Sequence, residues 1–413
     1  MDGVGRHRPE SRPAHAVGFR SVFAEREFRW LWTAGVQSLL GDQLARVALS
    51  VLVFERTSSS LLTAAVYALT FLPAFLGGVL LGGVADRYPR RRVLIGCDVL
   101  RAGLLAAMAL PATPLLVVAA LLTVATVVGA PFKAAEPALL ADLFTGERYV
   151  AALGLRTATY QASQLIGFAV GGVAVAAVGA RSALAIDAAS FAVSAALLRW
   201  GLQPRPAART SPAVTRKSGL VGGLRVVLGN RHLRLLLGLS WLAGIWVLPE
   251  GLAVPYAAAV GAGPAGVGWL LAANPAGNVI GALVMARWVP PHLRATLLGP
   301  LAVAAGLPLI LCAFRPGLLL TVALWALAGL CSAYQVQLIA EYIAAVPNAM
   351  RGQAIGLASA GLLAVQGLGL LIGGALAQIW TVHTTIAIAG GTGVFLATWL
   401  AINRTRTNHT ADK

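Results

Sequence analysis

Three acidic residues, Asp42, Asp187 and Glu250, lie inside long apolar stretches of the sequence. An ionisable side chain in a membrane core is costly, so such residues usually bind an ion or a substrate or pair with an opposite charge. Asp42 lies near the middle of the first stretch, and Arg46 follows one helical turn later. The two residues are therefore either a structural ion pair or a site where a proton or a cationic substrate competes with Arg46 for Asp42.

Glu250 follows Pro249 near the end of its apolar stretch, and a proline interrupts the backbone hydrogen bonds of a helix. Broken helices line the cavities of membrane transporters. Two roles stay open for Glu250, a gating or protonatable group and an interfacial carboxylate. Asp187 is a similar case, and both join Asp42 and Arg46 as candidates for ion and substrate coupling.

Enzyme chemistry finds no support in the sequence. It contains no nucleophile–base pair, no metal-ligand cluster and neither an HExxH nor a GxxxxGK[ST] motif. The three cysteines, Cys97, Cys312 and Cys331, have no paired spacing and are expected to be small packing residues. We therefore predict no catalytic residue, no metal site and no bound cofactor.

The elements that hold the acidic residues are expected to be membrane helices. Of the 413 residues, 58% are hydrophobic and 11% are charged, whereas a soluble domain has about 25% charged residues. We expect an all-α membrane protein with twelve transmembrane helices. The twelve apolar segments run over 29–54, 61–84, 93–111, 115–137, 149–178, 181–201, 232–260, 265–288, 294–314, 317–346, 352–380 and 382–402.

The basic residues predict the orientation of these segments. The net charge of +17 comes mainly from the N-terminal arm, the loop Arg87–Arg92, the stretch Arg199–Arg234 and the C-terminal tail. Short basic loops stay on the cytoplasmic side of a membrane, so this distribution needs no nucleic-acid partner. On the other side, the loops carry three arginines, Arg56, Arg181 and Arg315. The first 29 residues have no apolar core, which excludes a cleaved signal peptide.

These patterns predict a cell-membrane protein with both termini in the cytoplasm. The predicted organisation is a basic arm (1–28), a six-helix half (29–202), a cytoplasmic linker (203–230), a second six-helix half (231–402) and a tail (403–413). Two repeated halves around a central site are a common transporter design. A different twelve-helix transporter or a membrane enzyme is the alternative at this point.

The loop between the second and third segments carries a motif, Gly82-x-x-x-Asp86-Arg87-x-x-Arg90-Arg91. It resembles the loop between helices 2 and 3 of the major facilitator superfamily, with Pro89 where that pattern usually has glycine. The resemblance implies a latch that joins the two halves on the cytoplasmic side. Asp98 and Arg101, one turn apart on the next helix, resemble the charge network of this latch.

The fifth segment carries small residues at a spacing of about four, which lets helices approach closely. These residues are Gly154, Ser163, Gly167, Gly171 and Gly172. The arrangement also resembles the helix-5 signature of proton-coupled exporters, with Ser163 in place of glycine and Phe168 in place of proline. The arginine that drug exporters of the family often carry inside helix 4 is absent from Leu115–Pro131, and Lys133 is expected at the cytoplasmic end of that helix.

The resemblance implies a secondary transporter that works by alternating access, with the enterobactin and macrolide exporters as the most similar branch. The expected function is export of a small amphipathic molecule, such as a drug, siderophore or secondary metabolite, in exchange for protons. The proton gradient would supply the energy, and the protein would act as a monomer in the bilayer. The alternatives are an importer of a small metabolite and a scaffold or receptor that transports nothing.

Overall fold

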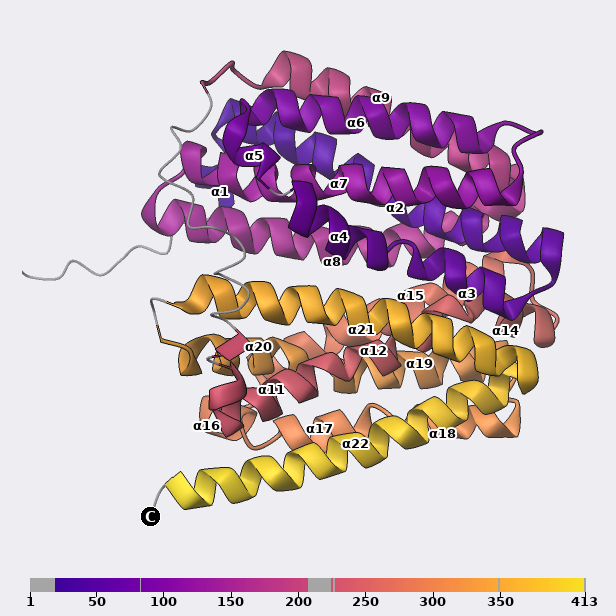
Figure 1. The fold of residues 1–413 in the computed structure, drawn as a ribbon, viewed down its shortest axis with the longest axis vertical. Helices are drawn as coiled ribbons and strands as arrows, with labels where there is room; N and C mark the ends of the chain where they lie inside the picture. The colour runs from indigo at the N-terminus through magenta and orange to yellow at the C-terminus, as the bar shows by residue number, and fades with distance from the viewer. Residues whose placement is uncertain (1–18, 82, 207–223, 226, 348–349, 412–413) are drawn as a thin grey trace, which may run out of the picture.

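The computed structural model describes residues 19–81, 83–206, 224–225, 227–347 and 350–411, except for the side chains of Asp86 and of residues 408–411. In the first half the helices are α1 (Phe19–Phe23), α2 (Arg26–Thr57), α3 (Ser60–Ala68), α4 (Leu72–Leu81), α5 (Val84–Arg87), α6 (Arg90–Ala109), α7 (Leu115–Leu143), α8 (Gly146–Val178) and α9 (Ala180–Gly201). They form one bundle, coloured indigo to pink in Figure 1.

The second half forms another bundle, which lies beside the first (Figure 1). Its helices are α11 (Arg231–Trp241), α12 (Ala243–Trp246), α13 (Leu248–Gly251), α14 (Ala253–Ala259), α15 (Pro264–Arg287), α16 (Pro291–Arg294), α17 (Leu298–Ala304), α18 (Leu307–Ile310), the 3₁₀ helix η1 (Leu311–Phe314), α19 (Leu318–Ser332), α20 (Tyr334–Ala345), α21 (Arg351–Ile379) and α22 (Val382–Ala411). We call the end of the molecule that holds Gly201 and Arg231 the linker end, and the other end the distal end.

The all-helical membrane fold expected from the sequence is confirmed. Within the described residues, ten helices or helix pairs are long and apolar enough to cross a membrane. Helix α6 has the length for a further span but carries five charged residues, and Leu298–Phe314 is a shorter apolar helix. Together these twelve segments match the twelve expected from the sequence.

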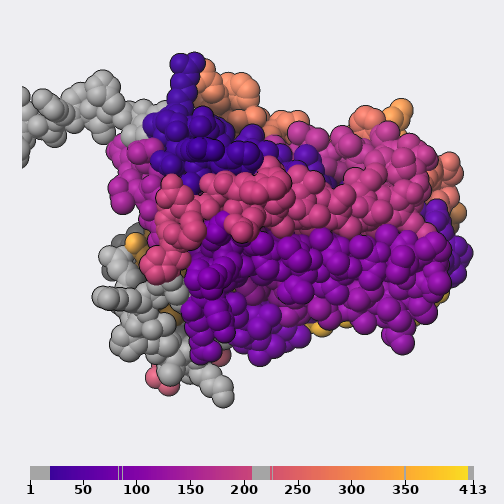
Figure 2. Space-filling view, turned by 90° about the horizontal axis from the view of Figure 1, so that it is seen from above, coloured from indigo at the N-terminus to yellow at the C-terminus, as the bar shows by residue number. Residues whose placement is uncertain are grey.

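The outer face of the first half is apolar, as in a protein that contacts lipid. Figure 2 shows α6 and α9 side by side along this face. Val99 and Leu100 on α6, and Ile186 and Val193 on α9, are exposed there. Asp98 and Asp187, their neighbours in sequence, are completely buried. These two acidic residues therefore face the inside of the bundle.

Three boundaries differ from the expected ones. Helix α7 continues to Leu143 although it contains Pro131 and Pro137, because neighbouring helices in a membrane can satisfy the freed backbone groups. The last helix, α22, continues to Ala411, although the segment from residue 403 was expected to be a tail. The short helix α1 lies in the expected N-terminal arm, where the Ser21 carbonyl accepts a hydrogen bond of 2.8 Å from Arg148.

The predicted linker lies largely outside the described residues, but its first residues are anchored. Arg205 donates two hydrogen bonds of 2.6 Å to the Glu27 carboxylate. The Gln203 amide donates a third bond of 3.1 Å to the same group. These bonds hold the start of the linker against the beginning of α2.

The two halves touch closely at the distal end. Gly172 of α8 lies against Gly268 of α15, and a Cβ atom at position 268 would be 2.7 Å from the Gly172 Cα. Ala64 of α3 packs in the same way on Gly374 of α21, where a Cβ atom would be 2.7 Å from the Ala64 Cβ. Backbones come this close only where side chains are absent or small.

The linker end is different. A Cβ atom at Gly154 of α8 or at Gly356 of α21 would meet no other atom within 4 Å. Near the linker end, these two glycines thus make no close contact of the kind that Gly172 and Gly374 make at the distal end.

Candidate functional site

The core of the site is an ion pair between Asp42, near the middle of α2, and Arg101 of α6. The Arg101 Nη2 atom donates to the Asp42 Oδ1 atom. The Arg101 guanidinium also lies over the Phe191 ring of α9, 4.0 Å from its centroid. The partner of Asp42 is thus Arg101 and not Arg46, which the sequence spacing favoured, because the two bundle helices α2 and α6 present these groups to each other.

Two further carboxyl groups lie beside this ion pair. Asp98 Oδ2 accepts a hydrogen bond of 2.5 Å from Ser194 Oγ, and Asp187 Oδ1 accepts one of 3.1 Å from Ser190 Oγ. The other carboxyl oxygens, Asp98 Oδ1 and Asp187 Oδ2, are buried without a hydrogen-bond donor among the described residues. A buried carboxylate oxygen without a donor is costly, so these two groups suit an exchange of partners or of a proton.

Arg101 links the three acids. It interacts electrostatically with Asp42, Asp98 and Asp187. Asp98 and Arg101 were expected to belong to the cytoplasmic latch. The structure places them on the face of α6 that points into the first half, where their partners come from α2 and α9, and their role in a latch stays a prediction.

Close helix packing brings Asp187 to this cluster. A Cβ atom at Gly41 of α2 would clash with the Asp187 carboxyl group and lie 2.5 Å from Ser190 Oγ. Gln37, one turn earlier, donates a hydrogen bond of 2.9 Å to the Ser190 carbonyl. The absence of a side chain at Gly41 thus lets α9 carry its acid to the ion pair on α2.

Lys133 is a site residue that the sequence analysis missed. It lines a cavity of about 70 Å³ together with Asp42, Arg46, Arg101 and Asp187. Lys133 lies ten residues before the end of α7, about 15 Å along the helix axis. It was expected at the cytoplasmic end because the fourth segment was expected to end at residue 137, whereas α7 continues to Leu143. The tolerance of membrane helices for proline is the signal that could have found it.

Glu250 connects this cluster to the second half. The Tyr67 hydroxyl of α3 donates a hydrogen bond of 2.9 Å to Glu250 Oε2 on the short helix α13. Arg46 interacts electrostatically with Asp42, Tyr67 and Glu250. Since Glu250 meets a partner from the other half, its surroundings fit the gating role better than that of an interfacial carboxylate.

The loop motif makes its described contacts within the first half. Arg90 pairs with Asp142 of α7 and donates a hydrogen bond of 2.8 Å to the Ala138 carbonyl. Arg91 donates to the Arg199 carbonyl at the end of α9. Arg87 is exposed, while Gly82 and the Asp86 side chain lie outside the described residues. The latch between the halves therefore stays a prediction.

The small residues of α8 serve two contacts. Gly167 and Gly171 face α2, where a Cβ atom would lie 2.8 Å from Gln43 Cβ and 3.3 Å from Leu44 Cα, respectively. Gly172 faces Gly268 in the second half. Ser163 is buried, and Gly154 borders free space. Helix α8 is thus packed on α2 along one side and on α15 along the other.

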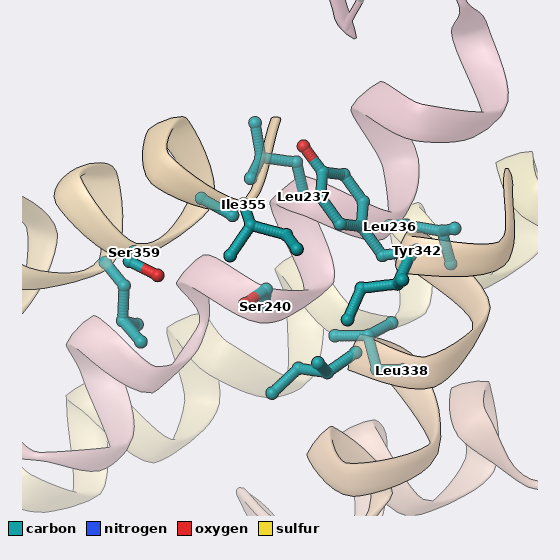
Figure 3. A pocket seen from close by; sticks show the side chains of 11 residues that line it. Leu236, Leu237, Ser240, Leu338, Tyr342, Ile355 and Ser359 are labelled. Carbon is teal, nitrogen blue, oxygen red and sulfur yellow. The ribbon is translucent and has the colours of Figure 1, made fainter. Parts of the chain in front are cut away.

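The second half contributes an apolar pocket near the linker end. It has a volume of about 90 Å³ between α11, α20 and α21. Figure 3 shows Leu236, Leu237, Leu338, Tyr342 and Ile355 around it, with Ser240 and Ser359 on its α11 and α21 sides. These two serines make no hydrogen bond through their side chains within the described part of the chain. The pocket offers mainly apolar contact with two free hydroxyl groups.

The comparisons with known proteins agree with this architecture. The model of the Major Facilitator Superfamily matches residues 31–254 and 250–413. The multidrug efflux pump Tap of Mycobacterium tuberculosis (strain ATCC 25618 / H37Rv) is 28% identical over 374 residues, which cover 85% of this chain and 87% of that protein. An uncharacterized MFS-type transporter of Bacillus subtilis (strain 168), YkuC, is 28% identical over 198 residues, 46% of this chain and 45% of that protein.

Solved structures share the fold at low sequence identity. The nucleoside transporter NupG superimposes with a TM-score of 0.73 and 15% identity, over 91% of this chain and 99% of that one. The POT family transporter PepTSo gives a TM-score of 0.74 and 12% identity, over 94% and 99%. Since the family model covers both halves, the chain belongs to the Major Facilitator Superfamily and is a multi-pass membrane transporter of the secondary type, not an enzyme.

Proposed function

We propose that this transporter exports small amphipathic molecules in exchange for protons, as a monomer in the cell membrane with both termini in the cytoplasm. The observation that carries the proposal is the set of acids and bases on α2, α6, α7 and α9 that lines one cavity inside the first half. Ionisable residues placed in this way mark ion and substrate pathways in membrane proteins. The similarity to a protein named as a multidrug efflux pump supports the outward direction.

The conformation fits a state ready to load from the cytoplasm. Basic residues are concentrated at the linker end, so the positive-inside rule puts that end in the cytoplasm. The halves touch closely at the distal end, through Gly172 and Gly268, whereas Gly154 of α8 and Gly356 of α21, near the linker end, make no such contact. A substrate would enter between the halves from the cytoplasm and leave after the contact at the distal end opens.

The candidate binding surfaces of the two halves have different chemistry, which suits an amphipathic substrate. The first half presents Asp42, Arg46, Arg101 and Lys133. The second half presents the apolar pocket with Ser240 and Ser359. A molecule with an apolar body and one or more polar groups would find a partner on each side. The pocket of about 90 Å³ would hold part of such a molecule, for example a single ring or a branched alkyl group.

Coupling would work through a change of partner at Arg101. A proton that binds Asp42 removes the negative charge that holds the Arg101 guanidinium. Asp98 and Asp187, each with one oxygen that lacks a donor in the described part, can then attract Arg101. Arg46 and the Tyr67–Glu250 hydrogen bond would carry this change to the contact between the halves.

The finer relationship to the enterobactin and macrolide exporters also belongs to this proposal. It rests on three short segments, Gly41-Asp42, Asp98-Val99-Leu100-Arg101-Ala102 and Asp187-Ala188-Ala189-Ser190-Phe191. Each of them supplies a residue of the charged cluster. The resemblance and the geometry therefore point to the same functional region.

Transport into everted membrane vesicles tests the proposal. We expect vesicles with this protein to accumulate the lipophilic cation rhodamine 6G when a proton gradient is present and to lose it when the gradient is collapsed. Vesicles without the protein are the control. Accumulation that needs no gradient would contradict proton coupling. Movement only in the opposite direction would indicate an importer, and saturable binding of the dye with no movement in either direction would indicate a scaffold or receptor.

The apolar pocket has its own test. Ile355→Trp should fill the pocket and raise the dye concentration for half-maximal transport about tenfold, a loss of about 1.4 kcal/mol. The maximal rate should change little. Leu368→Trp is the matched control, since Leu368 is exposed on the same helix and does not line the pocket. Equal effects of the two substitutions would exclude the pocket as a binding surface.

A further inference from the structure

A second cavity lies at the distal end, on the opposite side of the closed contact from the charged cluster. Its volume of about 640 Å³ falls within the range of about 300–1,000 Å³ that is usual for small-molecule sites. Phe54, Ser58 and Ser60 line it from the first half, and Arg315, Trp380 and His383 are among the residues that line it from the second half. The cavity therefore bridges the two halves.

Arg315 differs from the two other arginines expected on this side of the membrane. Arg56 donates a hydrogen bond of 3.1 Å to the Thr113 carbonyl, and Arg181 donates to the Leu110 carbonyl. Both thus satisfy carbonyl groups at or just beyond the end of α6. The Arg315 guanidinium makes no hydrogen bond or ion pair with any described residue, although it lines the cavity. Its charge is free for a ligand.

His383 supplies an independent observation. The residue is 6% exposed, and its Nε2 atom is buried without a hydrogen-bond partner in the described part of the chain. Its ring lies 4.5 Å from the Tyr256 ring, which fixes its position. Arg315 and His383 both line the cavity from the second half. A buried imidazole with an unused polar atom is costly unless a partner arrives.

Two lining residues have a left-handed backbone conformation. Ser58 and Arg315 are the only non-glycine residues with positive φ in the described part of the chain, at 49° and 53°. Both line the cavity, one from each half. Ser58 is the C-cap of α2 and Arg315 is the C-cap of η1, and a left-handed residue is a common way for a helix to end.

The lining chemistry favours an anion. The described residues that line the cavity include no aspartate or glutamate, and Ser58, Ser60 and Thr381 add hydroxyl groups. Phe54, Trp380 and Val382 provide apolar surface for the rest of a ligand. We propose that this cavity binds small organic anions, with the carboxylate or phosphate group on Arg315 and His383 and the apolar body against Trp380. A bound anion would hold the halves together at the distal end and slow transport.

Binding of radiolabelled benzoate to the full-length protein in nanodiscs tests this site. In neutral phosphatidylcholine nanodiscs we expect saturable binding that inorganic phosphate displaces and that neutral benzamide does not. Arg315→Gln should weaken binding at least tenfold, and His383→Phe should weaken it while the ring packing is kept. Arg56→Gln is the matched control, because it removes the same charge at the same end and should leave binding unchanged.

Two further measurements complete the test. In nanodiscs that contain phosphatidylglycerol, loss of benzoate binding would identify a lipid phosphate as the natural anion, and retained binding would identify a soluble one. Benzoate should also slow dye transport by the wild type and not by Arg315→Gln. Absence of saturable benzoate binding in neutral nanodiscs, or equal affinity in wild type and Arg315→Gln, would overturn the proposal.

Discussion

Substitution of Gly268 by valine should open the distal end. A Cβ atom at position 268 would lie 2.7 Å from the Gly172 Cα and 2.8 Å from the Phe168 carbonyl oxygen. Non-bonded carbon atoms settle at about 3.5–4.0 Å, so α8 and α15 would have to separate by about 1 Å. Overpacking of this size costs about 1–3 kcal/mol. The equilibrium between the closed and open distal end should then shift towards the open one by roughly 5- to 150-fold.

Labelling of a buried cysteine can follow this shift. Ala64 is completely buried in the contact between α3 and α21, so Ala64→Cys should react slowly with a membrane-impermeant maleimide added from outside. The native cysteines are buried and should give little background. In the Gly268→Val background the labelling rate of Ala64→Cys should rise at least fivefold. Dye export should fall, because the transporter would rarely return to the conformation in which the distal end is closed.

The matched control is Gly103→Val on α6. A Cβ atom at this exposed glycine would meet no atom within 4 Å, so the substitution changes the same residue type in a helix without touching the contact. The labelling rate of Ala64→Cys in the Gly103→Val background should equal the rate of Ala64→Cys alone. An unchanged labelling rate in well-expressed Gly268→Val would refute the view that this glycine contact closes the distal end.

Three other predictions follow from the same picture. Gly229→Cys and Ala112→Cys, both at exposed positions, should react with the impermeant maleimide only from the cytoplasmic and only from the outer side, respectively; reaction of both from one side would contradict the topology. Arg404→Met should lower the free energy of unfolding by about 3 kcal/mol, because Arg404 is buried and pairs with Glu341 at 2.8 Å. Arg231→Met, at an exposed position, should lower the free energy of unfolding far less. Equal losses in the two variants would contradict a stabilising role of the Arg404–Glu341 pair. Asp86→Asn should weaken transport about two- to fivefold, the value of a charge near a helix end, and raise labelling near the linker end; unchanged transport and labelling would make Asp86 a solvated turn residue.

Much of the fold could be predicted from the sequence because apolar segments of membrane length are long and strongly marked. The positions of Asp42 and Asp187 inside such segments already singled them out, since charges there are rare. Their assembly could not be predicted. The spacing of Asp42 and Arg46 suggested a pair on one helix, but the actual partner, Arg101, comes from α6, and its approach depends on how α2 and α6 are rotated.

Two other features depended on tertiary structure in the same way. Lys133 was placed at a helix end because the apolar segment was expected to stop at residue 137, although α7 continues to Leu143 through Pro131 and Pro137. The distal cavity combines residues in or just after α2 and α3 with residues of α14, α21 and α22 and of the loop after η1, separated by about two hundred positions or more in the chain. Three arginines were expected on the outer side of the membrane, and no local sequence pattern distinguishes Arg315 from the other two. Only the structure shows that Arg56 and Arg181 donate hydrogen bonds to backbone carbonyls, whereas the Arg315 guanidinium has no hydrogen-bond acceptor among the described residues.

The most direct test of the coupling proposal is Asp42→Asn in proteoliposomes. The substitution keeps the size of the side chain and removes the group that would bind a proton and hold Arg101. We expect dye accumulation driven by a proton gradient to be lost, while exchange of labelled for unlabelled dye without a gradient continues at a rate within about threefold of the wild type, since the apolar pocket is unchanged. Full gradient-driven accumulation by Asp42→Asn would contradict the account and move the proton site elsewhere, with Glu250 as the next residue to test.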